Sequence, residues 1–262
     1  MLAEALHFMR DQIGVNISNH EHGTAGPQFA IKFIGIAGIP GAGKSTLASM
    51  IQTALGGAEV VAILPMDGWH IPLAKLRESQ GERGVYWRGA PETFDESGFV
   101  KRLSEIRKTT CLLTKSDKMK IADNQVEKVD CSDLDSAEQG FLWPSFDHAI
   151  GDPDFNARVK ISPQQGTRLV LVEGLYVLHF AEAVEHLDGA IALHRRLSID
   201  EAVERLKERN KCIPGYSPQE IERRCDDVDR GNAQIALKSI DHALLESSSN
   251  QNKNIKLPIL AL

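Results

Sequence analysis

The residues most able to do chemistry in this sequence are a lysine and a serine that follow a glycine-rich turn. Their spacing matches Gly-x-x-x-x-Gly-Lys-Ser, the pattern of a phosphate-binding loop. Glycines allow positive φ, so the backbone N–H groups can turn toward an anion, and a helix that begins near Lys44 points its N-terminus at the same anion. The pattern predicts a site for a nucleoside triphosphate, formed by Gly38, Ile39, Pro40, Gly41, Ala42, Gly43, Lys44, Ser45 and Thr46.

Within this loop, Lys44 is predicted to hold the β- and γ-phosphates, and the hydroxyl of Ser45 is predicted to ligate Mg²⁺. A phosphate-binding loop alone does not separate kinases from ATPases or GTPases. The sequence contains no Asn-Lys-x-Asp run after a strand, so guanine specificity has no support.

Two acidic residues follow apolar runs that read as strands. Asp67 comes after residues 60–64, and Glu173 comes after residues 168–172. Because ligands of open α/β sheets bind beyond the carboxyl ends of the strands, both acids are expected on the side of the phosphate-binding loop. Glu173 is predicted to serve Mg²⁺, directly or through water, with a solvated strand-end carboxylate as the alternative. Asp67 is a candidate base for an acceptor hydroxyl, and turn formation by Asp-Gly is an equal alternative.

The elements that position these residues alternate between strands and helices, a pattern that predicts a parallel sheet in an α/β fold. The predicted helices include 44–55, which stops at two glycines, and a segment to about residue 107. Two more begin at Ser198-x-x-Glu201, a capping box, and at Ser217-Pro218, the last with a break near Gly231. The predicted strands are 29–37, 60–64, 168–174 and 189–193.

Three other segments carry weaker signals. Residues 2–13 have apolar residues at helical spacing, which predicts a helix that packs on the domain, with partner binding as the alternative. Residues 143–148 are predicted to be a loop whose aromatic side chains the core anchors. The resulting division is an N-terminal helix and connector (1–28), a P-loop domain (29–246) with a surface insertion at about 108–140 that holds one short strand at 111–113, and a tail (247–262).

The composition excludes several classes of protein. The chain has 262 residues and a net charge of −6 without any block of basic residues, so nucleic acid and anionic membranes have no electrostatic support as partners. Its four cysteines form no Cys-x-x-Cys pair, which argues against a zinc site or a disulfide framework. No apolar run approaches the length of a membrane span, and no secretory signal is evident. We therefore expect a cytoplasmic protein, and the sequence neither requires nor excludes a homo-oligomer.

Four ordered motifs carry a resemblance to a known family. They are 66–70 (MDGWH), 88–95 (RGAPETFD), 144–148 (PSFDH) and 172–178 (VEGLYVL). Together they resemble the phosphoribulokinase/uridine kinase superfamily of P-loop kinases, over about residues 30–245, and most closely its pantothenate-kinase-like and fungal uridine-kinase-like members. The chain lacks the Asp-x-Phe-Tyr run and the Asn-Phe-Asp-His-Pro motif of true uridine kinases, and has Gly-Ala-Pro where pantothenate kinases have Gly-Phe-Pro.

The resemblance implies transfer of the terminal phosphate of ATP, with Mg²⁺, to a hydroxyl of a small metabolite such as a nucleoside, sugar, glycerate or pantothenate-like compound. Asp67 then becomes the catalytic base, and His70 and Arg88 line the acceptor pocket. Arg205 and Arg209 match the lid that closes over ATP. A surface cation is the alternative for Arg88, and a solvated helix face that pairs with nearby glutamates is the alternative for the other two arginines.

The pattern and the resemblance together predict a three-layer P-loop NTPase fold with a central parallel sheet and a helical lid. The rival function is a P-loop ATPase or nucleotide-dependent binding protein without a small-molecule acceptor. It would keep Lys44, Ser45 and Glu173 and leave Asp67 without an acceptor. The presence of Asp67 and of the full motif at 88–95 favours the kinase.

Overall fold

The computed structural model describes residues 1–15, 30–119, 140–147, 150–163, 166–194, 197–211, 217–248 and 257–262. The strands are β1 (Lys32–Gly38), β2 (Val61–Pro65), β3 (Phe141–Leu142), β4 (Ser145–Asp147), β5 (Asp152–Asp154), β6 (Arg158–Val159), β7 (Leu169–Gly174), β8 (Gly189–Leu193) and β9 (Ile259–Ala261). The α-helices are α1 (Leu2–Asp11), α2 (Lys44–Ala54), α3 (Leu73–Tyr86), α4 (Glu96–Met119), α6 (Ala181–Val184), α7 (Ile199–Asn210), α8 (Pro218–Arg224) and α9 (Arg230–Ser248). Short 3₁₀ turns form η1 (Met66–Trp69) and η2 (Pro91–Thr93), and a π-helical turn forms η4 (Cys225–Asp229).

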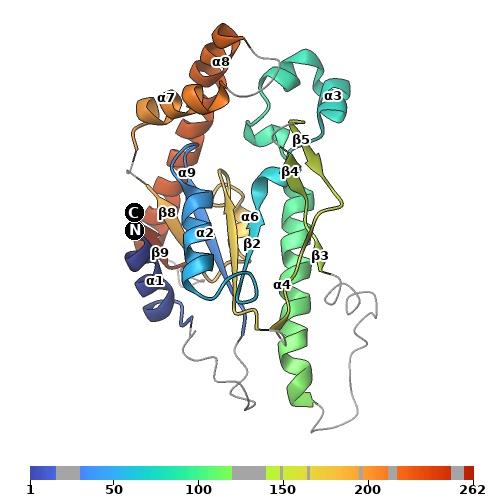
Figure 1. The fold of residues 1–262 in the computed structure, drawn as a ribbon, viewed down its shortest axis with the longest axis vertical. Coiled ribbons are helices and arrows are strands. Elements are labelled where there is room, and N and C mark those ends of the chain that lie inside the picture. The colour runs from blue at the N-terminus through green and yellow to red at the C-terminus, as the bar shows by residue number, and fades with distance from the viewer. Residues whose placement is uncertain are drawn as a thin grey trace.

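Five parallel strands form the central sheet, in the order β2-β7-β1-β8-β9 (Figure 1). β7 is buried along its whole length, as expected for a parallel strand that is covered on both faces. The order places β7, which carries Glu173, between β2 and β1, the strands that lead to Asp67 and to the phosphate-binding loop. The predicted parallel α/β sheet is therefore confirmed.

Helices cover both faces of the sheet and produce three layers (Figure 1). Because successive side chains of a strand point to opposite faces, alternate residues of β1 meet different helices. Ile34 and Ile36 pack with α1 and α2, and Phe33 packs with α4 and α6. α9 packs beside β8 and β9 through Ile240. Burial of Ala5, Phe8 and Met9 confirms that the N-terminal helix packs on the domain.

The predicted strand at 111–113 is wrong, because α4 continues without interruption to Met119. No glycine or proline lies between residues 107 and 119 to end the helix. The buried stripe of Phe99, Leu103 and Ile106 is extended at helical spacing by Thr110 and Leu113, which are 2% and 7% exposed. The predicted connector and residues 120–139 of the predicted insertion lie outside the described residues, so the division into segments remains a prediction.

The predicted capping box is present at the start of α7, and the helix predicted to begin at Ser217-Pro218 is α8, which also begins with a capping box. The predicted break near Gly231 is not where the helix changes, because α9 passes through this residue. The irregular turn is the π-helical η4, which directly precedes α9 and keeps Cys225 and Val228 buried. Such turns inside helices often accompany functional sites.

Two small hairpins, β3–β6 and β4–β5, stand beside the sheet. Trp143 is 1% exposed, and its Nε1 donates a hydrogen bond of 2.7 Å to the carbonyl of Pro65. This confirms that the core anchors the aromatic segment, although part of the predicted loop is the strand β4. Within the described residues, no helix has the length and apolar character of a membrane span.

Candidate functional site

The ends of three neighbouring strands bring the predicted site residues together. In the register of the sheet, Glu173 lies level with Ile36 of β1 and with Pro65 of β2. The phosphate-binding loop starts two residues after Ile36, and Asp67 lies two residues after Pro65. The loop, Asp67 and Glu173 therefore meet at the carboxyl edge of the sheet, as the sequence predicts.

The loop has the backbone conformation that its glycines suggest. Gly41 and Gly43 have φ values of 74° and 93°, and Gly43 is the N-cap of α2. Gly38 is not among the positive-φ glycines, so a different reason applies there: a Cβ on Gly38 would lie 2.9 Å from the Cβ of Leu193. The Lys44 Nζ donates a hydrogen bond of 3.2 Å to the carbonyl of Ile39, which holds the ammonium over the loop.

Ser45 and Glu173 are in direct contact. The Ser45 hydroxyl donates a hydrogen bond of 2.9 Å to the Glu173 Oε1, and Glu173 is 8% exposed. A hydroxyl beside a carboxylate is an oxygen donor set that suits Mg²⁺, which takes few protein ligands and completes its shell with phosphates and water. Within the described residues, no three or more His, Cys, Asp or Glu side chains are grouped so that they could hold a metal ion.

The charges at this edge of the sheet shift one another's ionisation. Burial lowers the pKa of the Lys44 ammonium and Arg209 lowers it further, against the attraction of Asp67 and Glu173. Burial likewise raises the pKa of the Glu173 carboxyl, and the charge of Asp67 adds to the rise, whereas the Ser45 hydroxyl and Lys44 oppose it. One half-buried cation thus acts on two carboxylates, and the entry of a phosphate and Mg²⁺ would strongly change the charge balance of this site.

Asp67 is held in place by the turn η1. A Cβ on Gly68 would lie 1.8 Å from the carbonyl oxygen of Pro144, so this glycine lets η1 pack directly on the segment between β3 and β4. The His70 Nδ1–H donates a hydrogen bond of 2.7 Å to the carbonyl of Asp67. The turn is therefore fixed from both sides, with the Asp67 carboxylate close enough to influence Lys44 and Glu173.

His70 and Arg88 lie in a stack of rings beside η1. The His70 ring is 4.0 Å from the Phe94 ring and 5.0 Å from the Phe146 ring, measured between centroids. The Arg88 guanidinium lies 5.4 Å from the Phe146 ring and donates to the Asp152 carboxylate at 2.7 Å. The Arg88 side chain is 9% exposed, so it is not a surface cation. It ties the β4–β5 hairpin to the motif at 88–95, and its contact with an acceptor remains a prediction.

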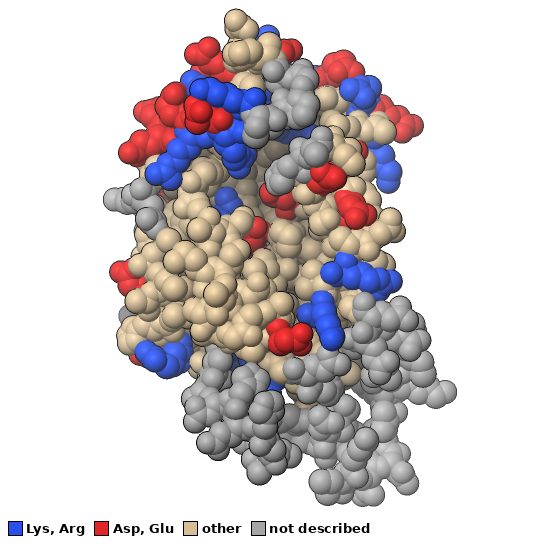
Figure 2. Space-filling view, viewed as in Figure 1, with Lys and Arg blue, Asp and Glu red and all other residues tan. Residues whose placement is uncertain are grey.

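Arg205 and Arg209 lie on α7, beside the loop. The Arg205 Nη1 donates to the carbonyl of Gly41 at 3.5 Å, and a Cβ on Gly41 would meet the Arg205 Cβ at 3.8 Å. Arg209 is close enough to lower the pKa of Lys44. Figure 2 shows Lys and Arg side chains gathered over α7 and α8, next to a hollow in this face. Both predicted lid arginines thus lie at the phosphate side of the site.

Sequence reasoning missed Asp229, in η4. Burial raises the pKa of its carboxyl, against a hydrogen bond with Cys225 and the positive charges of Arg224 and Arg209. The available signal was its place directly after Val228, in a segment whose apolar residues are buried. An acid at the buried side of a helix needs partners, and here they lie on α7, on α8 and on η4 itself.

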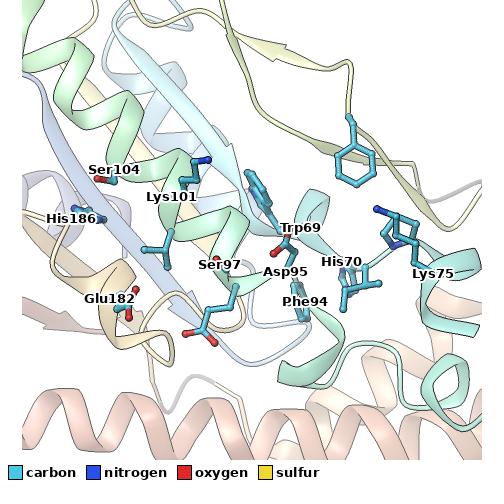
Figure 3. A pocket seen from close by; sticks show the side chains of 15 residues that line it. Trp69, His70, Lys75, Phe94, Asp95, Ser97, Lys101, Ser104, Glu182 and His186 are labelled. Atoms are coloured by element: carbon cyan, nitrogen blue, oxygen red, sulfur yellow. The ribbon is translucent and has the colours of Figure 1, made fainter. Parts of the chain in front are cut away.

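A cavity of about 1030 Å³ lies on another side of η1 (Figure 3). Its lining runs along the first turns of α4 from His186 and Glu182 to His70 and Lys75. Neither the phosphate-binding loop nor Asp67 or Glu173 contributes to it. We therefore locate the candidate functional site at the loop, where the groups able to bind phosphate and Mg²⁺ converge, and not in this cavity.

Comparison with known proteins agrees with this geometry. Over 149 residues the chain is 34% identical to a Schizosaccharomyces pombe protein named "Putative uridine kinase C227.14", a match covering 55% of this chain and 51% of that protein. Over 210 residues it is 27% identical to the ATP-dependent kinase YFH7 of Kluyveromyces lactis, covering 76% of this chain and 57% of that one. The chain is similar to P-loop kinases.

A solved structure has a similar fold. The structure of D-glycerate 3-kinase from Cryptococcus neoformans matches with a TM-score of 0.58 at 12% identity, covering 100% of this chain and 95% of that chain. At this identity the likeness shows the fold alone. The two curated relatives agree with the resemblance to the phosphoribulokinase/uridine kinase superfamily that the motifs carry. No family model matches the sequence. The chain spans about half the length of the curated relatives it matches.

Proposed function

We propose that this protein is an ATP- and Mg²⁺-dependent kinase that transfers the terminal phosphate of ATP to a hydroxyl of a small metabolite. The observation that carries the proposal is the convergence of Lys44, Ser45, Glu173 and Asp67 at one edge of the sheet. The ATP-dependent kinase name of a relative and the D-glycerate 3-kinase name of a structural neighbour support the choice of reaction.

Each residue has a role that its surroundings allow. The loop amides and Lys44 bind the phosphates, because the loop glycines and the start of α2 direct N–H groups to one place. Ser45 and Glu173 would hold Mg²⁺, which when bound neutralises charge on the phosphates. Arg205 and Arg209 approach the same phosphates from α7 and stabilise the charge of the transferred group.

Asp67 orients the acceptor hydroxyl and takes its proton. The turn η1 fixes the backbone of Asp67, and its carboxylate lies close enough to Lys44, the proposed phosphate ligand, for its charge to act on the lysine. A general base must lie within hydrogen-bond reach of the proton it removes, and a rigid turn at a strand end supplies that position. The neighbouring motif, with His70 and Arg88, is the proposed side from which the acceptor approaches.

The alternative is a P-loop ATPase or nucleotide-dependent binding protein that lacks a small-molecule acceptor. Such a protein would need the loop, Ser45 and Glu173 and would not need Asp67 to be held rigidly. The close packing of Gly68 on Pro144 and the bond from His70 favour the kinase, because they fix the backbone of the turn that carries a carboxylate hydrolysis does not require.

The test is incubation of the full chain with Mg²⁺ and ATP labelled in its terminal phosphate. Separate reactions contain D-glycerate, uridine, pantothenate or a simple sugar, with Lys44→Ala as the inactive control. The expected result is label on one of these compounds in the native protein and on none with the control. Release of label solely as inorganic phosphate in every reaction would favour the ATPase, and no turnover at all would favour the binding protein.

A further inference from the structure

Tyr86, the last residue of α3, contacts the opposite side of the site. Its hydroxyl donates a hydrogen bond of 2.6 Å to the Asp227 carboxylate in η4, and its carbonyl accepts one of 3.0 Å from the Arg224 Nη1 in α8. The guanidinium groups of Arg223 and Arg224 lie 5.2 and 5.9 Å from its ring. One aromatic side chain thus meets three charged residues from a segment about 140 positions away.

The two segments that Tyr86 joins carry opposite halves of the proposed site. On the near side, α3 begins after η1, which holds Asp67, and Arg88 follows Tyr86 by two residues. On the far side, Asp229 follows Asp227 by two residues. The charge of Arg209 lowers the pKa of the Asp229 carboxyl and also that of the Lys44 ammonium. The contact therefore links the acceptor side of the site to the phosphate side.

The far segment has an apolar cluster of its own. Val203 and Leu206 of α7 pack with Ile221 of α8 and Cys225 of η4, in a cluster distinct from those on the sheet. We call α7, α8 and η4 the lid. Ala202 of α7 also packs in the main cluster on the sheet and anchors one end of the lid, whereas Ile221 and Cys225 pack within the lid's own cluster, so that end can change position as a unit.

The contact itself is weak enough to be reversible. Tyr86 belongs to none of the apolar clusters of the described residues. Its partners are open to solvent, since the side chains of Arg223 and Asp227 are 73% and 48% exposed. Exposed polar contacts of this kind are weak, so they can bias a position without holding the fold together. A contact that served only stability would gain more from apolar burial.

We propose that Tyr86 is a positioning residue that holds the lid against α3 and so keeps Arg209 and Asp229 over the phosphate-binding loop during the reaction. The inference rests on the proposed function, because a kinase that closes over its nucleotide excludes water that would compete with the acceptor. The hydroxyl and the ring act separately: the hydroxyl bonds Asp227, and the ring faces the two guanidinium groups.

The test measures hydrogen exchange of the amides in 217–229 in the full chain, with the non-hydrolysable analogue AMP-PNP and Mg²⁺. Tyr86→Phe, which keeps the ring, is expected to speed exchange about threefold, and Tyr86→Ala about tenfold or more. The control is Arg77→Ala, which breaks an exposed ion pair with Glu82 on the same helix and leaves the lid untouched. Its exchange is expected to match that of the native protein.

Equal exchange rates in all four proteins would overturn the proposal. If Tyr86→Ala does not fold, Tyr86→Phe and Asp227→Asn carry the test, and their effects should not add because both remove the same hydrogen bond. Exchange does not depend on turnover, so the result stands even if no acceptor is found. Once an acceptor is known, Tyr86→Ala should lower kcat and leave the KM for ATP within about threefold, a split that a purely structural role would not produce.

Discussion

Replacing Ser45 by alanine tests whether the hydroxyl supports an ionised Glu173. The bond between them measures 2.9 Å, and Glu173 is 8% exposed. Hydrogen bonds to charged groups contribute about 1.5–3 kcal/mol, and partial exposure of Ser45 puts this one near the lower end. At about 2–4 °C per kcal/mol for a chain of this size, the melting temperature of the nucleotide-free protein should fall by about 3–6 °C at pH 7.5.

The loss should depend on pH in a defined direction. Burial, then Asp67, holds the pKa of Glu173 above its ordinary value of 4.5, and the Ser45 hydroxyl opposes that rise. A carboxyl whose pKa is raised on folding contributes stability at pH values below its unfolded pKa and loses it as the pH rises through the folded pKa. Without the Ser45 hydroxyl the pKa of Glu173 rises further, so the alanine variant loses more stability than the native protein as the pH increases. The difference in melting temperature between the native protein and the alanine variant should appear above about pH 4.5. It should be largest at pH values above the pKa that Glu173 has in the variant.

The assay is thermal unfolding of both proteins without nucleotide, between pH 4.5 and 8. Ser45→Thr keeps the hydroxyl and is the matched control, with a melting temperature close to that of the native protein at every pH. Glu173→Gln should remove the pH dependence of the gap. A gap of the same size at pH 4.5 and pH 8, or an equal loss in the threonine variant, would refute the reasoning.

Three further outcomes are expected. Lys44→Ala should abolish ATP turnover while the melting temperature without nucleotide changes by no more than about 2 °C, because burial of its charge offsets its attraction to Asp67 and Glu173; loss of the cooperative transition would mean that the lysine is structural. Asp67→Asn should slow phosphoryl transfer by about 10²–10⁴ and leave ATP affinity within a few-fold, in paired kinetic and binding measurements; joint collapse would assign Asp67 to the magnesium site. Replacing Arg205 and Arg209 together by glutamine should lower kcat by at least about tenfold with little change in the KM for ATP, and an unchanged kcat would leave both on a solvated helix.

The chemistry of the loop could be predicted from sequence because its determinants are local. Gly41, Gly43 and Lys44 lie within four residues, and each has a physical reason that holds in any fold. The convergence of Asp67 and Glu173 also followed, since both end apolar strands and parallel strands present their carboxyl ends at one edge. These two arguments locate the candidate site before any contact is known.

The parts that escaped prediction depend on pairs far apart in the chain. Arg88 reads as an ordinary loop cation until Asp152 is found beside it, 64 positions later. Tyr86 gives no local sign of its bond to Asp227. The short strands β3 to β6 have two or three residues each, too few for alternation to be visible. The end of α4 was misjudged because polar residues around its buried stripe resemble a surface loop.

The edge strand β9 has a consequence for how the chain reaches its native state. It pairs in parallel with β8, Ile259 level with Ala190, so the sheet gains its outermost strand from residues that are synthesised after all its other strands. Until then β8 presents an unpaired edge, which can template association with other chains. Parallel strand pairs joined through long connections also form slowly, because the entropy cost of closing the loop comes before the strands can form their hydrogen bonds. A chain truncated before residue 259 would keep the phosphate-binding loop but leave the edge of β8 unpaired. We expect such a chain to be less soluble during synthesis, although its phosphate-binding residues are intact.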